Sequence, residues 1–244
     1  MSPCRLFQSP LGSGRVTLTD SEARHAVAAR RCRVGDEVVL FDGAGNEAIG
    51  WLTRVGDGGV EVTVEAEAMR RYPFDIARRV TIAVAMPKPH RQGYLIEKCT
   101  ELGVAAIWPI LTDRGVSRPN ASAAARWRRR AIEAAKQSGR RWIPEVSPPR
   151  RFAETLDRAS AFDAAAMAHV EGSATPLREL IADGPAESSI VVWIGPEGGW
   201  SPDELDGADR ASLRRVTLAP TMLRTETAAV AVCALAASMD GRSV

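Results

Sequence analysis

The sequence predicts a small β-barrel domain followed by an α/β domain with a mostly parallel sheet. Short β-type runs separated by glycine and aspartate turns fill residues 1–72, which is typical of a small barrel. From Val80 onward, apolar strand-like runs alternate with helical patterns, which indicates a parallel sheet covered on both faces. With 244 residues, the chain is long enough to bury a core in each of two modest domains.

The elements of the first domain follow from its turn residues and its apolar alternation. The polar run at residues 20–22 is expected to begin a short helix that continues to Ala29. Turns rich in aspartate and glycine separate the predicted strands. Strands are expected at 16–18, 37–41, 48–52 and 60–64. The charged segment 65–78 is expected to be a linker.

The second domain, residues 73–244, has a strand–helix rhythm. Apolar residues in 93–102 recur on one helical face, and Gly103 supplies the stop after that helix. Strands are expected at 80–86, 104–110, 163–168, 190–194 and 215–218. Helices are expected at 93–102, 121–138, 176–182, 202–211 and 225–239. Ligands of such open sheets bind beyond the carboxyl ends of the strands.

Composition excludes several classes of protein. No apolar run approaches the roughly 20 residues that span a bilayer, and the N-terminus lacks a signal-peptide pattern, so a cytoplasmic protein with no membrane partner is expected. The four cysteines and three histidines are scattered, so free thiols and no metal site are expected. Basic residues far outnumber acidic ones between residues 114 and 151. This stretch fits either phosphate binding or a solvated helix face.

The first of two informative runs near the C-terminus is the loop Ile194–Gly199. Three of its residues are glycines, which permit positive φ angles and a close approach of a ligand to the backbone. Ser201, Pro202 and Glu204 then predict a capped helix start, with serine as N-cap and glutamate closing a capping box. Alone, the run fits either a well-made turn or a ligand loop. It lacks the G-x-G-x-x-G fingerprint, so a Rossmann dinucleotide site is not supported.

The second run leaves a predicted strand at Leu218 and restarts as a helix, with Thr225 expected as its N-cap. The helix that follows is apolar all round, which indicates burial in a core or in an interface. Arg224 stands directly before it, where a cation opposes the helix dipole. A compensating anion is therefore expected beside Arg224: a phosphate, a developing negative charge, or the carboxylate of Glu197 or Glu226.

Together, the I-G-P-E-G-G-x-S-P-x-E and L-x-x-x-x-L-R-T-E-T-A runs resemble SPOUT-class methyltransferases. More narrowly, they resemble the bacterial family that methylates N3 of a uridine in 16S ribosomal RNA. Lys88 with 97–104, the segment 126–144, and Arg5, His25 and 31–36 also match that family, in order along the chain. Departures occur at Pro89-His90, at Asp113-Arg114-Gly115 and at Arg24-His25, outside the two loops.

The resemblance implies a PUA-like RNA-binding β-barrel at 1–72 and a trefoil-knotted SPOUT α/β domain at 73–244. It also implies a cytoplasmic homodimer that uses S-adenosylmethionine on RNA of the small ribosomal subunit. The cofactor-binding positions are expected to be Ile194, Gly195, Pro196, Gly198, Gly199, Leu218, Met222, Leu223, Thr225 and Thr227. Arg224, Glu197 and Glu226 are the expected catalytic residues. The expected RNA-binding residues are Arg5, His25, Arg31, Lys88, Arg114, Arg126, Arg128, Arg140 and Arg141.

Two other functions remain open at this point. A SPOUT enzyme that methylates a ribose 2′-hydroxyl would have the same fold and cofactor but a different product. A non-catalytic ribosome-assembly factor would keep the fold, although it would be free to lose residues such as Gly198, Gly199 or Arg224. The intact loops therefore favour an enzyme.

Overall fold

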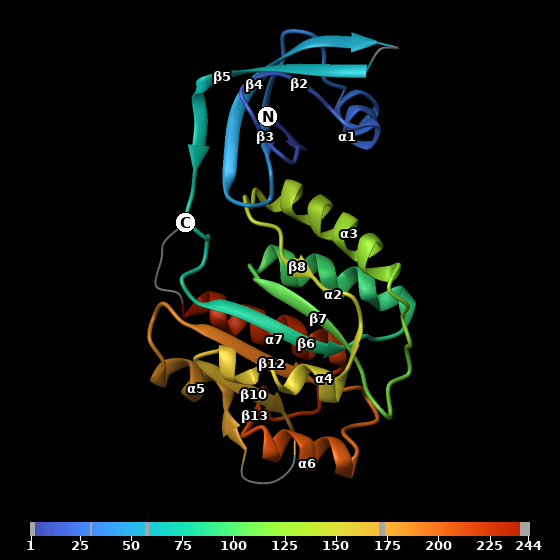
Figure 1. Ribbon diagram of the computed structural model, residues 1–244, viewed down its shortest axis with the longest axis vertical. Coiled ribbons are helices and arrows are strands. Elements are labelled where there is room, and N and C mark those ends of the chain that lie inside the picture. The colour runs from blue at the N-terminus through green and yellow to red at the C-terminus, as the bar shows by residue number, and fades with distance from the viewer. Residues whose placement is uncertain (1–2, 30, 57–58, 171–173, 240–244) are drawn as a thin grey trace. The chain divides into compact units, whose positions relative to one another are not determined.

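The structure, a computed structural model, describes residues 3–29, 31–56, 59–170 and 174–239, and it forms two compact units (Figure 1). The first unit comprises the described residues up to Asp75 together with Ala135–Ile143. The second unit comprises Ile76–Ala134 and the described residues from Pro144 onward. The domain limits of 72 and 73 stay a prediction, and the contacts add a distant segment to the first unit.

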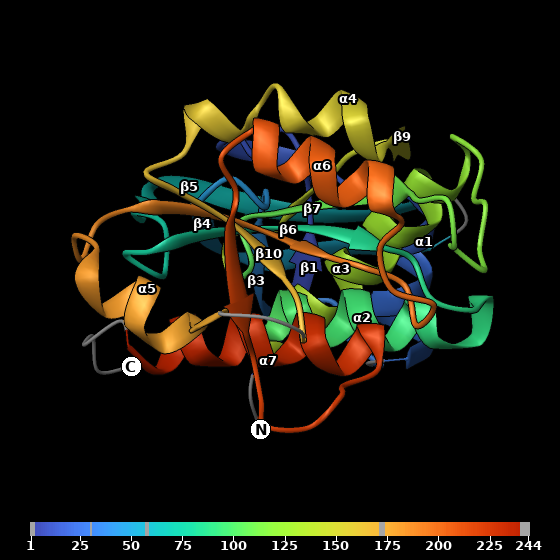
Figure 2. The same ribbon diagram turned by 90° about the horizontal axis from the view of Figure 1, so that it is seen from below.

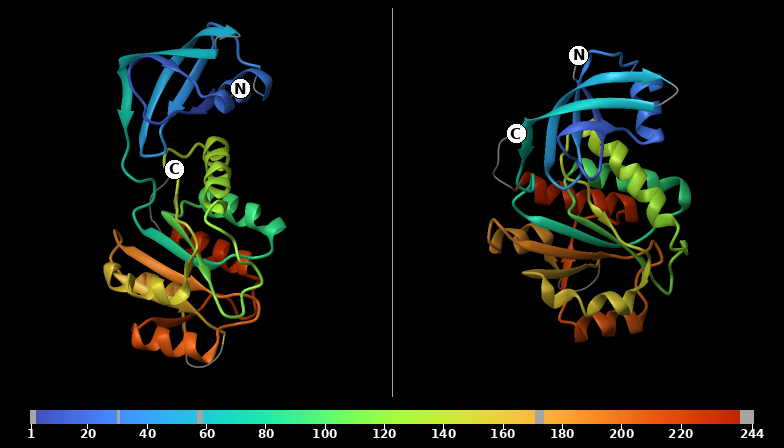
Figure 3. Two further views of the ribbon diagram at one scale, coloured as in Figure 1. Left: turned by 45° about the vertical axis from the view of Figure 1, so that its right-hand side comes forward. Right: turned by 45° about the horizontal axis from the view of Figure 1, so that its top comes forward.

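The first unit is built on a five-stranded sheet with the order β1-β3-β4-β5-β2 (Figures 1 and 3). Its strands are β1 (Cys4–Phe7), β2 (Gly14–Thr17), β3 (Glu37–Phe41), β4 (Asn46–Gly56) and β5 (Gly59–Arg71). β1 is parallel to β3, and the other pairs are antiparallel. The sheet buries Leu6, Leu40 and Val62 completely. The predicted helix is α1 (Asp20–Arg24), which continues as a π-helical turn, His25–Ala29.

The expected linker at 65–78 is wrong for its first half, because β5 continues to Arg71. Beyond an irregularity in the pairing, Met69 lies opposite Ala48 and Arg71 lies opposite Asn46. Most side chains from Glu65 onward are exposed or half-buried, and a strand can carry charge on a face that water covers. The charge of this segment was therefore no sign of a linker.

Segment Ala135–Ile143 joins the first unit through buried polar contacts. Lys136 Nζ lies 3.0 Å from Glu22 Oε1, and both side chains are about 95% buried, with 5% and 6% exposure. The Ile143 backbone N–H donates to the Gly43 carbonyl at 3.0 Å. The first four residues of this segment are the last turn of a helix, Ala123–Ser138, that begins in the second unit, so no break in the sequence pattern marks the segment.

The second unit contains a parallel sheet with the order β11-β13-β10-β12-β6-β7-β8, and β9 pairs with β7. Its strands are β6 (Arg79–Ala85), β7 (Ala106–Leu111), β8 (Glu145–Val146), β9 (Arg150–Arg151), β10 (Ala164–Ala168), β11 (Thr175–Pro176), β12 (Ser189–Ile194) and β13 (Arg214–Thr217). The five strands predicted here are confirmed with small shifts of their ends. β8, β9 and β11 have two residues each, which is too short for a hydrophobic period to reveal.

Helices cover both faces of this sheet, as the alternation predicts (Figure 2). α4 (Phe152–Leu156) and α6 (Pro202–Arg210) lie on one face; α2 (Pro89–Glu101), α5 (Leu177–Asp183) and α7 (Thr225–Ser238) lie on the other. α3 (Ala123–Ser138) is the predicted arginine-rich helix. α2 begins earlier than expected because Pro89 occupies its first turn, where a missing N–H has no cost.

The order of the strands places three carboxyl ends side by side. β10 lies between β12 and β13, and all three are parallel. After β13 the chain returns to α7, which packs against α2, β6 and β12. The loops that leave β10, β12 and β13 therefore meet at one edge of the sheet. The two informative runs near the C-terminus, which begin at Ile194 and Leu218, are the loops after β12 and β13.

Candidate active site

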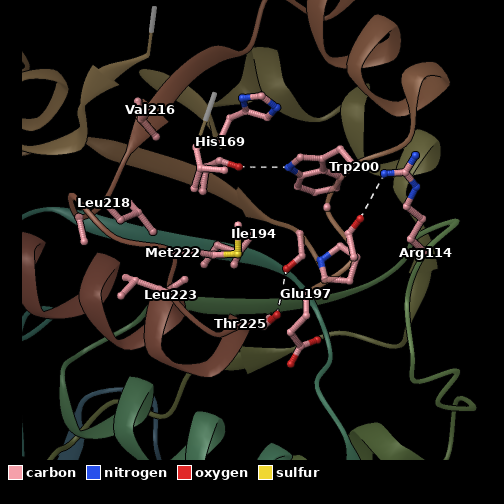
Figure 4. Close-up of a pocket in the computed structure, with 18 of the residues that line it drawn as sticks. Arg114, His169, Ile194, Glu197, Trp200, Val216, Leu218, Met222, Leu223 and Thr225 are labelled. Atoms are coloured by element: carbon pink, nitrogen blue, oxygen red, sulfur yellow. Dashed lines mark hydrogen bonds between the residues drawn. The ribbon is translucent and has the colours of Figure 1, made fainter. Parts of the chain in front are cut away.

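A cavity of about 330 Å³ opens at that edge of the sheet (Figure 4). It is lined by residues that follow β10, β12 and β13, by the start of α7, and by Arg114 from the loop after β7. The lining includes Ala168, His169, Val170, the run Ile194–Trp200, Val216, Leu218, Ala219, Thr221, Met222, Leu223, Thr225 and Ala228. The two loops singled out in the sequence thus form walls of one cavity.

The loop after β12 is shaped by close packing. A Cβ atom on Gly195 would lie 2.8 Å from the Trp200 ring, and Gly199 has a φ of +70°. The Trp200 indole N–H donates to the Ala168 carbonyl at 3.1 Å, which joins the loop to the end of β10 (Figure 4). The predicted capping box is confirmed: the Ser201 side chain accepts from the Glu204 N–H, and the Glu204 carboxylate accepts from the Ser201 N–H.

The loop after β13 meets the first loop through Thr225. The expectation that Thr225 caps α7 is wrong, because Arg224 occupies the N-cap position and makes no side-chain cap. The Thr225 hydroxyl donates instead to the Gly195 carbonyl at 3.1 Å (Figure 4). A tertiary hydrogen bond therefore uses the hydroxyl that local sequence assigned to the helix end.

The expected cofactor positions lie on the cavity wall with one exception. Thr227 is exposed in the first turn of α7 and is not part of the lining. Met222 lines the cavity with 76% of its surface exposed, an unusual place for a large apolar side chain. Sequence reasoning missed His169 and its neighbours, although the predicted strand 163–168 pointed to them, since its carboxyl end lies at the same sheet edge.

The expected catalytic carboxylates converge on a residue that sequence reasoning missed. Arg91 Nη1, from the first turn of α2, lies 3.1 Å from Glu226 Oε1 and 4.0 Å from Glu197 Oε1. Glu226 is nearly buried, with 10% of its side chain exposed, whereas Glu197 lines the cavity and is 37% exposed. In Figure 4 the Glu197 carboxylate lies on the opposite side of its loop from His169. No pattern in the sequence linked Arg91 to either carboxylate.

Arg224 is exposed beside this cluster and is not part of the cavity lining. Within the described ranges its side chain forms no hydrogen bond or ion pair, so of the alternatives for Arg224, pairing with Glu197 or Glu226 does not occur in this structure. The guanidinium is therefore available to an anion from outside the chain.

The expected RNA-binding residues of the second unit keep their charged groups accessible. Lys88 and Arg128 are exposed. Arg126 Nη2 donates to Gln92 Oε1 at 3.3 Å, and Arg114 Nη1 donates to the Gly198 carbonyl at 3.2 Å. Both of these acceptors are neutral, so all four residues retain a net positive charge for phosphate.

In the first unit, three of the expected RNA-binding arginines are engaged in ion pairs. Arg5 and Arg141 both contact Glu47, at 2.6 and 3.2 Å. Arg140 is 9% exposed and lies 3.4 Å from the Asp75 carboxylate. Of the other two, His25 is half-buried and Arg31 is exposed. Much of the charge expected for RNA here is neutralised inside the unit.

The cysteines play no visible part in the site. All four are free; Cys32, Cys99 and Cys233 are buried and Cys4 is half-buried. The hydrogen bond between the Cys99 and Cys233 side chains, together with burial, raises the pKa of the Cys99 thiol well above its usual value. This thiol therefore stays neutral and unreactive.

Comparisons with known proteins decide the family. Residues 75–237 match the family described as RNA methyltransferase domain, and residues 18–65 match the RNA methyltransferase PUA domain. The chain belongs to the RNA methyltransferase family. The resemblance to SPOUT-class methyltransferases and the presence of a PUA-like domain are thereby confirmed.

Relatives in this family include ribosomal RNA small subunit methyltransferase E of Mycobacterium tuberculosis, which is 34% identical over 89% of this chain and 84% of the relative. The Bacillus subtilis protein of that name is 30% identical over 87% of this chain and 85% of its own. Among solved structures, a putative methyltransferase from Legionella pneumophila with bound S-adenosylmethionine superposes with a TM-score of 0.86 at 26% identity, covering 98% of each chain. Ribosomal RNA small subunit methyltransferase E from Neisseria gonorrhoeae, bound to S-adenosyl methionine, gives 0.81 at 29% identity and 95% coverage of each.

The comparisons and the fold agree on a methyltransferase with an RNA-binding module. No helix in the described part of the chain is long and apolar enough to cross a membrane.

Proposed function

We propose that this protein transfers a methyl group from S-adenosylmethionine to N3 of a uridine in 16S ribosomal RNA. The observation that carries the proposal is the cavity between the loops after β12 and β13. Its lining includes all of the cofactor-binding positions that the family resemblance implies except Thr227. The relatives named above are methyltransferases of small-subunit ribosomal RNA. The choice of uridine N3 rests on the resemblance across the two domains.

The residues present fit the cofactor. Ile194, Leu218 and Leu223 offer an apolar lining for an adenine ring, and the exposed Met222 side chain can close over it. Around Gly195 and the neighbouring glycines, the absence of side chains lets the backbone approach the ribose and the amino-acid part of S-adenosylmethionine. Bound there, the sulfonium supplies an activated methyl group. The proposal assigns cofactor contacts to the expected positions except Thr227, which lies off the cavity.

A hydrogen bond between the loops supports this cavity, so Thr225→Val is expected to weaken cofactor binding. The lost bond to Gly195 corresponds to about 1 kcal/mol, or roughly fivefold in Kd. Isothermal titration calorimetry with S-adenosylmethionine measures the change. Thr227→Val alters the same residue type two positions along and is expected to bind like the unchanged protein. If cofactor binding were weakened in Thr227→Val but not in Thr225→Val, then Thr227 would be a cofactor contact, as the family resemblance implies, and the cavity would not be the binding site.

The chemistry needs a proton acceptor, because N3 of uridine lies between two carbonyl groups and becomes a good nucleophile only when its proton leaves. We assign this role to Glu197, whose loop forms a wall of the cavity and whose side chain is 37% exposed. Glu226 is too deeply buried to reach a base. Arg224 is assigned to the negative charge that develops on the uridine carbonyl oxygens, or to a flanking phosphate. N3 then attacks the methyl carbon in line, from about 3 Å, as the bond from carbon to sulfur breaks.

RNA is proposed to contact the exposed cations of the second unit and the PUA-like first unit. A base edge is accessible only when the nucleotide is unpaired or flipped out. Replacing Arg126 and Arg128 together by glutamine is expected to lower the slope of log K against log salt by about 1 for each lost phosphate contact. Fluorescence anisotropy with labelled RNA measures the slope. Arg178→Gln, on α5, is the control. If the slope of log K against log salt were unchanged in the double variant, Arg126 and Arg128 would only form a solvated face of α3.

The finer points of architecture are also proposed. We propose a trefoil knot in the second unit, supported by the position of β13 between β10 and β11 and by the return of α7 to β6 and β12. We propose a homodimer, supported by the half-buried apolar face of α7 at Val230, Ala231 and Ala234. A cytoplasmic location and domain limits of 1–72 and 73–244 complete the proposal.

Methyl transfer from labelled S-adenosylmethionine to unmodified small ribosomal subunits and to naked 16S RNA tests the function. Mass spectrometry of the product nucleosides is expected to find 3-methyluridine. A ribose-methylated nucleoside would favour the rival enzyme. Absence of both transfer and cofactor binding would favour the assembly factor.

A further inference from the structure

Arg91 joins two walls of the cavity through one guanidinium nitrogen. Its Nη1 atom lies 3.1 Å from Glu226, at the start of α7, and 4.0 Å from Glu197, in the loop after β12. We infer that Arg91 is a positioning residue: Glu226 anchors it, and it orients the Glu197 carboxylate toward the substrate. This inference rests on the proposed function, in which Glu197 accepts the N3 proton.

Glu226 has the properties of an anchor. Its side chain is 10% exposed, and its Oε2 atom is buried without a hydrogen-bond partner in the described part of the chain. A carboxylate in such a place needs a cation, because an unpaired buried charge is strongly unfavourable. Arg91 supplies that cation. The Arg91–Glu226 contact is therefore held by the cost of separating the two charges.

The backbone that carries Arg91 is held as well. The neighbouring Gln92 is 3% exposed, and its amide nitrogen donates to the Pro87 carbonyl at 2.9 Å and to Ser117 Oγ at 3.1 Å. Its amide oxygen accepts from the Trp127 indole at 3.2 Å. This network fixes the first turn of α2 between three segments of the second unit. Arg91 therefore projects from a rigid support, as a positioning residue requires.

Glu197 is the most exposed member of the cluster. It sits between Pro196 and Gly198, is 37% exposed, and has Arg91 as its only charged partner among the described residues. Without that partner, its side chain is free to occupy several rotamers, most of them unproductive. A displacement of about 1 Å in a reacting group can reduce a rate roughly 10²-fold. Arg91 is thus expected to affect kcat far more than cofactor affinity.

A purely structural role would have a different signature. If Arg91 only neutralises Glu226, then removing both charges should restore stability and activity together. The variant Arg91→Met/Glu226→Gln separates the two roles, because it leaves no unpaired buried charge. Single Arg91→Met is expected to lose thermal stability as well as activity, so it is not informative alone.

The experiment measures Tm, the Kd of S-adenosylmethionine by calorimetry, and kcat and KM for RNA, in the full chain with and without Glu197→Gln. In the double variant we expect a Tm near that of the unchanged protein, a similar Kd, and a kcat roughly 10²-fold lower at similar KM. In a Glu197→Gln background, the same double change should have almost no further effect, because both act through one carboxylate. Wild-type kcat in the double variant, or effects that multiply, would overturn the inference.

Crystal structures of the unchanged protein and the double variant give a readout that does not depend on the reaction. The Glu197 carboxylate is expected beside Arg91 in the first and displaced in the second. An identical Glu197 position in both would overturn the inference even if methyl transfer is confirmed. If Glu197 lies against Arg91 in the unchanged protein but no uridine is methylated, the result would support the positioning by Arg91 and refute the proposed function.

Discussion

Glu197→Gln is expected to lower kcat for methyl transfer by roughly 10²–10⁴-fold, the range that positioned proton transfer contributes. Glutamine keeps the shape of the side chain but cannot accept the N3 proton. Arg91, the one charged partner of Glu197 among the described residues, remains paired with Glu226 in this variant, so Arg91 keeps its position. Initial rates with 16S RNA, with calorimetry for cofactor Kd, measure the effect, and Kd is expected to change little.

The exposed Glu154 on α4 offers a matched control, since Glu154→Gln makes the same chemical change outside the cavity. Arg224→Ala in the same assay tests the charge-stabilising role, with an expected loss of roughly 10²–10³-fold in kcat. A Glu197→Gln enzyme that turns over like the unchanged protein would assign proton removal to water or RNA. If Arg224→Ala raised KM alone, Arg224 would be a phosphate contact.

The largest effect on stability is expected from Lys136→Met. Lys136 and Glu22 are 5% and 6% exposed, and their charged atoms lie 3.0 Å apart. Without the ammonium group, the one remaining donor to Glu22 among the described residues is the Phe7 backbone N–H, at 3.0 Å. Removal of one partner of a buried ion pair costs about 3–5 kcal/mol. Faster amide hydrogen exchange in peptides from β3 is the expected result.

A second variant keeps this prediction specific. In Lys136→Met/Glu22→Gln no charge is left buried, and the glutamine oxygen can still accept from Phe7, so most of the lost stability should return. Equal protection from exchange in the single variant and the unchanged protein would show that water reaches the pair. Exchange in β12, in the second unit, provides an internal reference, because the chain need not unfold as one cooperative unit.

Local chemistry explains which elements could be predicted. The strands at 190–194 and 215–218 and the helix at 202–211 appear within a few residues of the expected ends. The predicted capping box of Ser201 and Glu204 is present in the structure, because its hydrogen bonds join residues only three positions apart. The loops of the cavity were found for the same reason: glycine permits positive φ angles and proline fixes φ wherever they occur.

The misses have a different cause. Thr225 satisfies the capping pattern, yet its hydroxyl bonds to Gly195, thirty positions away. The charged residues at the end of β5 led to the prediction of a linker, because the sequence does not show which face of a strand is exposed to water. Arg140 looked like a phosphate ligand, yet it is buried beside Asp75. For Thr225 and Arg140, a long-range contact replaced the one that local sequence suggested.

By itself, the sequence determined the family, the longer strands and helices of the second unit in their order, and the two loops that line the cavity. These follow from periods of two and 3.6 residues, from turn chemistry, and from motifs that are contiguous in the chain. The tertiary structure alone decided that Arg91 faces Glu197 and Glu226, and that residues 135–143 belong with the first unit. The physical reason is that the contacts of Arg91 with Glu197 and Glu226, and of Lys136 with Glu22, join residues more than a hundred positions apart, and their energy depends on burial and distance, which no local pattern encodes.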